Sequence, residues 1–148
     1  MSGPPAGCHV FALRVYYEDT DAGGIVYHAS YLRFAERART EALRALGVPH
    51  AELADLCGLI FVVRRIKVDY LRPARLDDAL AVTTRVASLA GAAVRLVQEI
   101  RNTGGDATLV RLEVDLAVVR RSDGRPARLP PRWREALARL AGADGKGD

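Results

Sequence analysis

Four strand-like stretches in succession constrain the fold of this 148-residue chain more than any other feature. Each is rich in apolar residues, and Gly, Pro or Asp residues separate one from the next. The stretches run roughly over Leu59–Leu71, Leu80–Leu89, Ala92–Asn102 and Thr108–Arg120. Connections this short cannot hold a crossover helix, so we expect the strands to pair antiparallel.

A fifth strand and a long helix precede this run. His9–Tyr17 is largely apolar on both of its alternating faces, which predicts a strand covered on both sides. From about His28 to Leu46, apolar residues recur at helical spacing, and Gly47 is the expected stop. The predicted stripe comprises Tyr31, Phe34, Ala35, Ala38, Ala42, Ala45 and Leu46. Its small residues let a helix lie close to a sheet, so we place it on the concave face.

Two shorter helices complete the predicted elements, one over Val48–Gly58 and one over Pro130–Leu140. The order of elements predicts an α+β fold, with one antiparallel sheet covering the stripe of one helix. We expect residues 1–8 to be a flexible N-terminus, residues 9–141 a single domain and residues 142–148 a disordered tail.

Composition excludes several classes of protein. No apolar run is long enough to span a membrane, and the first residues do not have the pattern of a signal peptide. Cys8 and Cys57 do not have the spacing of a disulfide framework, so we expect a cytoplasmic protein. With 22 basic and 18 acidic residues the net charge is +4, which suits a phosphate-bearing ligand. The basic run Arg120–Arg139 contains one aromatic residue, Trp133, so we expect no nucleic-acid partner.

The loop before the long helix is the most informative segment for function. Carboxylates at Glu18, Asp19 and Asp21 are followed by Gly23 and Gly24, just ahead of the predicted helix. The first N–H groups of a helix are unpaired and can bind a developing oxyanion. A carboxylate beside such donors suits acyl transfer or hydrolysis. The local pattern alone favours turn and capping roles for the two aspartates.

Three segments resemble one known family. Val15–Tyr31 reads VYYEDTDAGGIVYHASY, Phe61–Tyr70 reads FVVRRIKVDY, and Pro73–Asp78 reads PARLDD. These motifs are similar to those of the YbgC-like acyl-CoA thioesterases, which are often associated with the Tol-Pal system and are related to 4-hydroxybenzoyl-CoA thioesterase. The resemblance extends from about residue 9 to 130. It implies a hotdog fold, a five-stranded antiparallel sheet wrapped around a long central helix. It also implies a homodimer or homotetramer with sheets joined edge to edge.

The resemblance also implies catalytic roles. Asp21 corresponds to the family's catalytic aspartate, acting as nucleophile on the thioester carbonyl or as general base for water. The backbone N–H of His28 would polarise that carbonyl, and its side chain would orient substrate or water. Gly23 and Gly24 would let the backbone approach the substrate, and Tyr27 would line the acyl pocket. No metal or redox cofactor is implied, because CoA is part of the substrate.

The sequence departs from the hydroxybenzoyl branch where that branch holds the nucleotide phosphates. The corresponding turn, Ser88–Val94, carries no charge. Arg64, Arg65 and Lys67 are alternative phosphate contacts. Otherwise CoA is held loosely, or the acyl group is presented by acyl carrier protein.

Other functions than thioester hydrolysis are also compatible with parts of the sequence. A non-catalytic hotdog scaffold acting with acyl carrier protein or the Tol-Pal system would not need Asp21 and its glycine loop. A hotdog hydratase usually has a different Asp/His spacing, which is absent from the sequence. A divalent-cation site at the three loop carboxylates lacks further ligands, and Cys57 lacks a neighbouring base.

Overall fold

The computed structural model describes residues 7–141. The predicted tail at 142–148, and residues 1–6 of the predicted flexible N-terminus, lie outside the described residues, so the domain boundaries stay a prediction. The elements in chain order are β1 (His9–Arg14), a 3-10 turn (Tyr17–Asp19), α1 (Ser30–Ala45), α2 (His50–Cys57), β2 (Leu59–Tyr70), β3 (Ala79–Ala90), β4 (Ala93–Asn102), β5 (Thr108–Arg120) and α3 (Pro131–Ala138).

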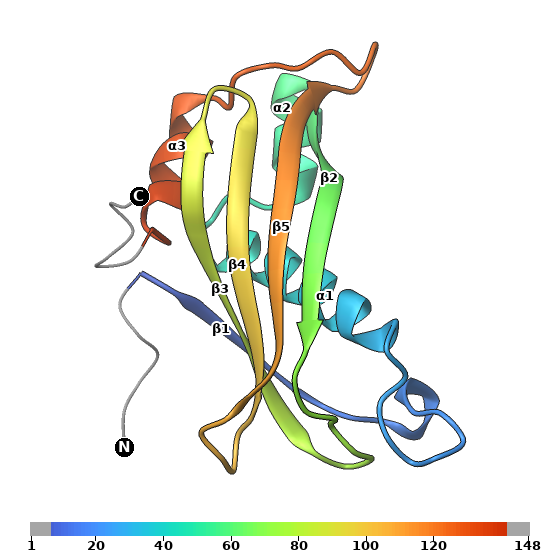
Figure 1. The fold of residues 1–148 in the computed structure, drawn as a ribbon. Helices are drawn as coiled ribbons and strands as arrows, with labels where there is room; N and C mark the ends of the chain where they lie inside the picture. Colours follow the sequence, from blue (N-terminus) through green and yellow to red (C-terminus); the bar gives the residue numbers. More distant parts are fainter. Residues whose placement is uncertain (1–6, 142–148) are drawn as a thin grey trace.

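The five strands form one antiparallel sheet in the order β1-β3-β4-β5-β2, which confirms the predicted pairing (Figure 1). Register shifts between Val63 and Arg65 on β2, and between Val86 and Ser88 on β3, interrupt the ladders. Irregularities of this kind bend a strand and increase its twist. The two edges of the sheet are β1 and β2, because each pairs with one neighbour only.

The first strand is shorter and more exposed than predicted. β1 ends at Arg14, and Tyr17–Asp19 forms the 3-10 turn instead of continuing the strand. Ala12 and Arg14 are exposed, so the expectation of a strand covered on both sides is wrong. The reason is position, because β1 forms an edge of the sheet, where fewer neighbours cover its side chains.

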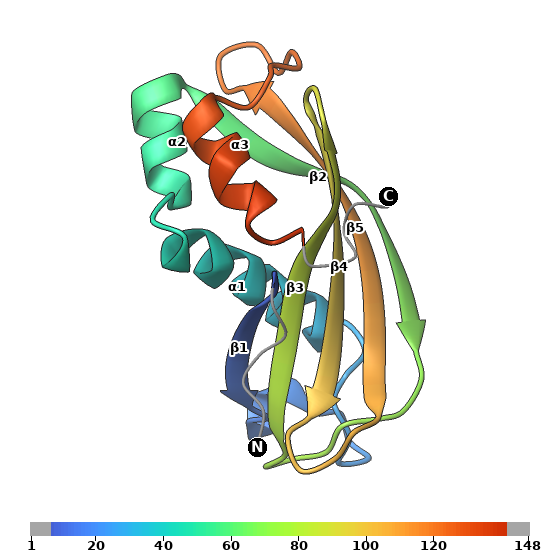
Figure 2. The same ribbon diagram turned by 90° about the vertical axis from the view of Figure 1, so that its left-hand side faces the viewer.

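Helix α1 lies on one face of the sheet, which we call the inner face, and α2 and α3 lie on the same side (Figure 2). Tyr31, Phe34, Ala35, Ala38 and Ala42 of the predicted stripe are buried, whereas Ala45, the last helical residue, is exposed. Strand β5 supplies Leu112, Val114 and Leu116 to the same core. The helix therefore buries the side that its periodicity predicted.

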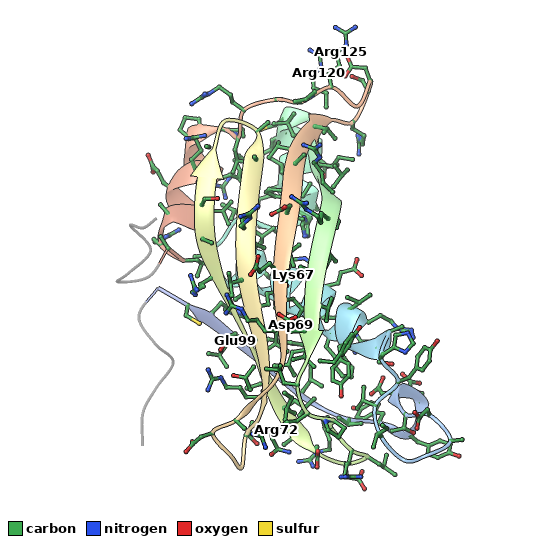
Figure 3. All side chains as sticks on the ribbon, viewed as in Figure 1. Lys67, Asp69, Arg72, Glu99, Arg120 and Arg125 are labelled. Carbon is green, nitrogen blue, oxygen red and sulfur yellow. The ribbon has the colours of Figure 1, made fainter. Side chains whose placement is uncertain are left out.

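The outer face of the sheet carries charge. Register pairs Arg65 with Asp115 and Lys67 with Glu113, so these side chains lie on one face, while the buried Val114 between the two acids faces α1. Figure 3 labels Lys67 and Glu99 on the face turned to the viewer, with α1 behind the sheet. No helix within residues 7–141 is long and apolar enough to cross a membrane.

Candidate active site

The loop from β1 to α1 is fixed to the segment that joins β2 to β3. The N–H of Val26 donates to the carbonyl of Ala74 at 2.9 Å, and the N–H of Leu76 donates to the carbonyl of Gly24 at 3.3 Å. The side chain of Tyr31, on α1, accepts a hydrogen bond from the N–H of Ala74 at 2.9 Å. The second half of the loop and the start of α1 are thus held to the same segment, and Tyr31 is the core residue that the sequence predicted.

Asp19 organises the loop from inside. Its buried carboxylate accepts the N–H of Tyr16 at 2.8 Å. Its carbonyl accepts the N–H of Tyr27 at 2.9 Å and the hydroxyl of Ser30 at 3.2 Å. These contacts give Asp19 the capping role that the local pattern favoured. Within residues 7–141, no three His, Cys, Asp or Glu side chains gather in a group able to hold a metal ion.

Asp21 faces the solvent. Its Oδ1 accepts the N–H of Gly23 at 2.8 Å, and its carbonyl accepts the N–H of Gly24 at 3.2 Å. The other carboxylate oxygen receives no hydrogen bond from the part of the chain that the structure describes. A Cβ on Gly23 would lie 3.3 Å from Asp21 Oδ1, and Gly24 has a φ of +83°. Gly23 therefore leaves room for the Asp21 carboxylate, and Gly24 adopts the positive φ that the turn after Asp21 requires.

His28 presents an unused backbone donor. The neighbouring N–H groups of Tyr27 and Ser30 donate to Asp19 and Tyr27, whereas the N–H of His28 has no acceptor among residues 7–141. Helix α1 begins two residues later, at Ser30. The positive end of the helix dipole therefore lies near this donor, an arrangement that can polarise a carbonyl oxygen.

Aromatic side chains surround His28. Its ring lies 4.5 Å from the ring of Tyr27 and 6.3 Å from the ring of Tyr70, measured between centroids. The Tyr70 hydroxyl donates to the carbonyl of His28 at 3.3 Å. Tyr70 ends β2, and sequence reasoning did not single it out as a site residue. The only signal was its place at the end of the FVVRRIKVDY motif.

The predicted phosphate contacts lie elsewhere on the sheet. Arg65 and Lys67 are on the outer face, and Arg64 adjoins them at the register shift in β2. Arg64 and Arg65 line one depression together with Arg95 of β4, a residue that the sequence analysis missed. Asp115 pairs with Arg65 at 3.3 Å and with Arg95 at 2.7 Å. The structure brings Asp21, Gly23, Gly24, Tyr27 and His28 into one loop, and it does not bring these basic residues into that loop.

A five-stranded antiparallel sheet packed against a long helix is the arrangement of the hotdog fold, and similarity to known proteins places the chain among the hotdog thioesterases. The family model of the thioesterase-like superfamily matches residues 15–137. A probable thioesterase from Bartonella henselae has a solved structure that is 41% identical with a TM-score of 0.78, covering 83% of this chain and 99% of that one. The DHNA-CoA thioesterase from Staphylococcus aureus, 24% identical with a TM-score of 0.85 and 95% of each chain covered, shares the fold.

A curated relative narrows the class. The acyl-CoA thioesterase YbgC of Haemophilus influenzae is 44% identical over 131 residues, which cover 88% of this chain and 94% of that protein. The chain therefore belongs to the YbgC family of the thioesterase-like superfamily, and it is a thioester hydrolase.

Proposed function

We propose that the protein hydrolyses an acyl-CoA thioester to the free acid and CoA. The observation that carries this proposal is the loop that holds an exposed Asp21 carboxylate and the unpaired N–H of His28. The carboxylate supplies or activates the attacking oxygen, and the N–H polarises the thioester carbonyl. The acyl-CoA activity of the YbgC relative supports the same reaction.

Two chemical routes fit an aspartate in this position. As nucleophile, Asp21 attacks the carbonyl, CoA leaves as the thiolate and takes a proton, and water then hydrolyses the acyl-aspartyl anhydride. As general base, Asp21 removes a proton from a water molecule that attacks directly, and the proton passes to the leaving sulfur. Single turnover in ¹⁸O-water tests the nucleophile route. Label in the Asp21 side chain requires the anhydride, with water attacking its aspartyl carbonyl. Label in the product acid alone is the result expected of the general-base route, or of water attacking the acyl carbonyl of the anhydride.

The substrate contacts proposed beside the catalytic pair use the same loop and the outer face. Gly23, Gly24 and Tyr27 would line the thioester, and Arg64, Arg65 and Lys67 on β2 would contact the CoA phosphates. Arg64 and Lys67 support this role because neither forms an ion pair within the described part of the chain. The proposed reaction needs no cofactor beyond the CoA of the substrate.

The proposed assembly is a cytoplasmic homodimer that joins the β2 edges, with pairing of dimers into a tetramer as a further step. Strand β2 offers a 12-residue open edge, whereas β1 has six residues. Val63 and Tyr70 on β2 are 49% and 48% exposed. Long exposed edges carrying apolar residues tend to pair with another chain.

The test is thiol release from a panel of acyl-CoAs, short, long and aromatic, with Asp21→Asn beside the wild type. We expect the variant to lose at least about a hundredfold in rate, the size typical of a positioned acid–base group. Glu18→Gln is the matched control, because Glu18 is an exposed carboxylate of the same loop. Equal rates for wild type and Asp21→Asn would contradict the catalytic role. If no acyl-CoA reacts, thioesters of acyl carrier protein are the next substrates, and binding without turnover would indicate the scaffold.

A further inference from the structure

A cavity lies between the three helices and the inner face of the sheet. Its volume is about 190 Å³, and no residue of the Asp21 loop lines it. Most of its wall is apolar and includes Leu43 of α1, Phe61 of β2, Leu96 of β4, Leu116 of β5 and Leu137 of α3. We call this space the inner cavity.

Arg39 is the cation in the wall of the inner cavity. It is half-buried, and burial lowers the pKa of its guanidinium against the opposing effect of Glu36. Its Nη1 donates to Gln98 Oε1 at 2.9 Å, and no carboxylate within residues 7–141 lies within 4.0 Å of it. A guanidinium has five N–H donors, so several remain for a ligand.

Buried polar groups hold Arg39 in place. Gln98 is fully buried, and its amide nitrogen donates to the carbonyl of Ala35 at 3.0 Å and to the hydroxyl of Thr84 at 2.9 Å. The amide oxygen is thereby directed at Arg39. His50 also lines the cavity, and its pKa is lowered by desolvation and by Arg39 and Arg44, with Glu36 opposing. Glu36 lines the cavity as well, but its carboxylate lies more than 4.0 Å from the guanidinium, so Arg39 remains without an ion-pair partner among residues 7–141.

The size and the charge together define a class of ligand. An apolar protein cavity of about 150 Å³ binds benzene, so about 190 Å³ accepts a ring or a chain of roughly six carbons. A desolvated cation is costly unless an anion pairs with it. We propose that the inner cavity binds a small apolar carboxylate, with its carbon body against Leu43, Phe61 and Leu96 and its carboxylate on Arg39.

The first test measures binding of benzoate at pH 7 to the intact protein by NMR titration. Arg39→Gln should weaken binding about tenfold or more, the size of a lost charge-assisted hydrogen bond. Arg37→Gln, which removes an exposed cation from the same helix, should leave binding unchanged. Benzyl alcohol has a similar shape without the charge and should bind at least about tenfold more weakly. Equal affinity of the two probes, or of the two variants, overturns the proposal.

A second measurement needs no variant. Nuclear Overhauser contacts from the benzoate ring should reach the methyl groups of Leu43 and Leu96 in the wild-type protein. Contacts to Tyr27 and Tyr70 alone would place the probe at the Asp21 loop and overturn the proposal. Because Asp21→Asn should bind benzoate as the wild type does, failure of hydrolysis and failure of this site are separate results.

Two sources of such a carboxylate are distinguished by kinetics. If the ligand is the far end of an acyl group, Arg39→Gln should lower kcat/KM for glutaryl-CoA at least about tenfold more than for butyryl-CoA. If it is a free acid, both substrates should respond equally, and benzoate should alter hydrolysis in the wild type but not in Arg39→Gln. Benzoate acting equally on both proteins would overturn the proposal.

Discussion

Two aspartates that lie two residues apart have different surroundings. Asp19 ends the 3-10 turn, is buried and accepts the backbone N–H of Tyr16 through its carboxylate, whereas Asp21 lies beyond the turn and is exposed. The carboxylate of Asp19 is thus occupied in holding the loop. One oxygen of the Asp21 carboxylate accepts no hydrogen bond from residues 7–141. The turn therefore separates a structural acid from one that is open to solvent.

The space beside Asp21 yields a prediction for Gly23. Gly23→Ala would put a methyl group 3.3 Å from Asp21 Oδ1, so the carboxylate must shift by a few tenths of an ångström. Because a displacement of about 1 Å can cost a hundredfold in rate, we expect kcat to fall about tenfold. Thiol release measures it. Gly105→Ala is the control, since a Cβ there meets nothing within 4 Å. A drop of equal size in both variants would argue against steric displacement.

Tyr70 yields the second prediction at this scale. Tyr70→Phe removes the hydroxyl that donates to the carbonyl of His28, which frees the segment carrying the unpaired N–H. We expect kcat/KM to fall about fivefold, within the range for one neutral hydrogen bond. Tyr17→Phe changes a residue that is 82% exposed and should leave hydrolysis unaltered. Unchanged hydrolysis in Tyr70→Phe would show that this hydroxyl does not position His28.

At the scale of elements, one buried amide joins helix to sheet. Gln98 on β4 contacts Ala35 and Arg39 of α1 and Thr84 of β3. Gln98→Leu leaves buried partners unsatisfied, and we expect the free energy of unfolding to fall by about 2 kcal/mol or more. Urea denaturation at fixed protein concentration measures it. Thr83→Val is the comparison, because its hydroxyl makes only a 3.5 Å contact, and an equal loss there would contradict the argument.

The elements differ in how far the sequence predicts them. The buried side of α1 follows from local periodicity, and four of the strands lie within a few residues of their predicted bounds. The place of β1 at a sheet edge depends on pairing between His9–Arg14 and Ala79–Thr84, more than 60 residues away in sequence. The local sequence pattern does not indicate that pairing. The same holds for Tyr70 beside His28 and for Arg95 beside Arg65, which meet only through the folded sheet.

At the scale of the whole molecule, two histidines make stability depend on pH. Desolvation is the main cause that lowers the pKa of both His9 and His50 in the folded chain. The unfolded chain therefore takes up protons first as pH falls through about 6.5. The free energy of unfolding should reach its highest value above about pH 7 and should decrease as the pH falls below about 6.5. Urea denaturation at several pH values tests this. His50→Gln should make the free energy of unfolding depend less steeply on pH. An unchanged pH dependence in this variant would show that His50 does not contribute to it.

The open edge of β2 predicts how two protomers pair. The same pairing predicts which parts of the candidate site lie next to the second protomer. Two β2 strands paired antiparallel about a two-fold axis would bury both rows of free backbone groups. The Tyr70 end of each strand, which contacts His28, would then lie beside the Leu59 end of its partner. The Asp21 loop would thus border the second protomer, so loss of the dimer should also reduce hydrolysis.

Substitution at that edge tests the assembly. Val63→Lys would place two ammonium groups near the two-fold axis, and like charges across an interface cost several kcal/mol. We therefore expect the dimer dissociation constant to rise at least about a hundredfold by analytical ultracentrifugation, with hydrolysis reduced in parallel. Ala12→Lys, on the opposite edge strand β1, is the matched control and should change neither. A monomer produced by Ala12→Lys and not by Val63→Lys would assign the interface to β1, and the Asp21 loop would then not border the second protomer.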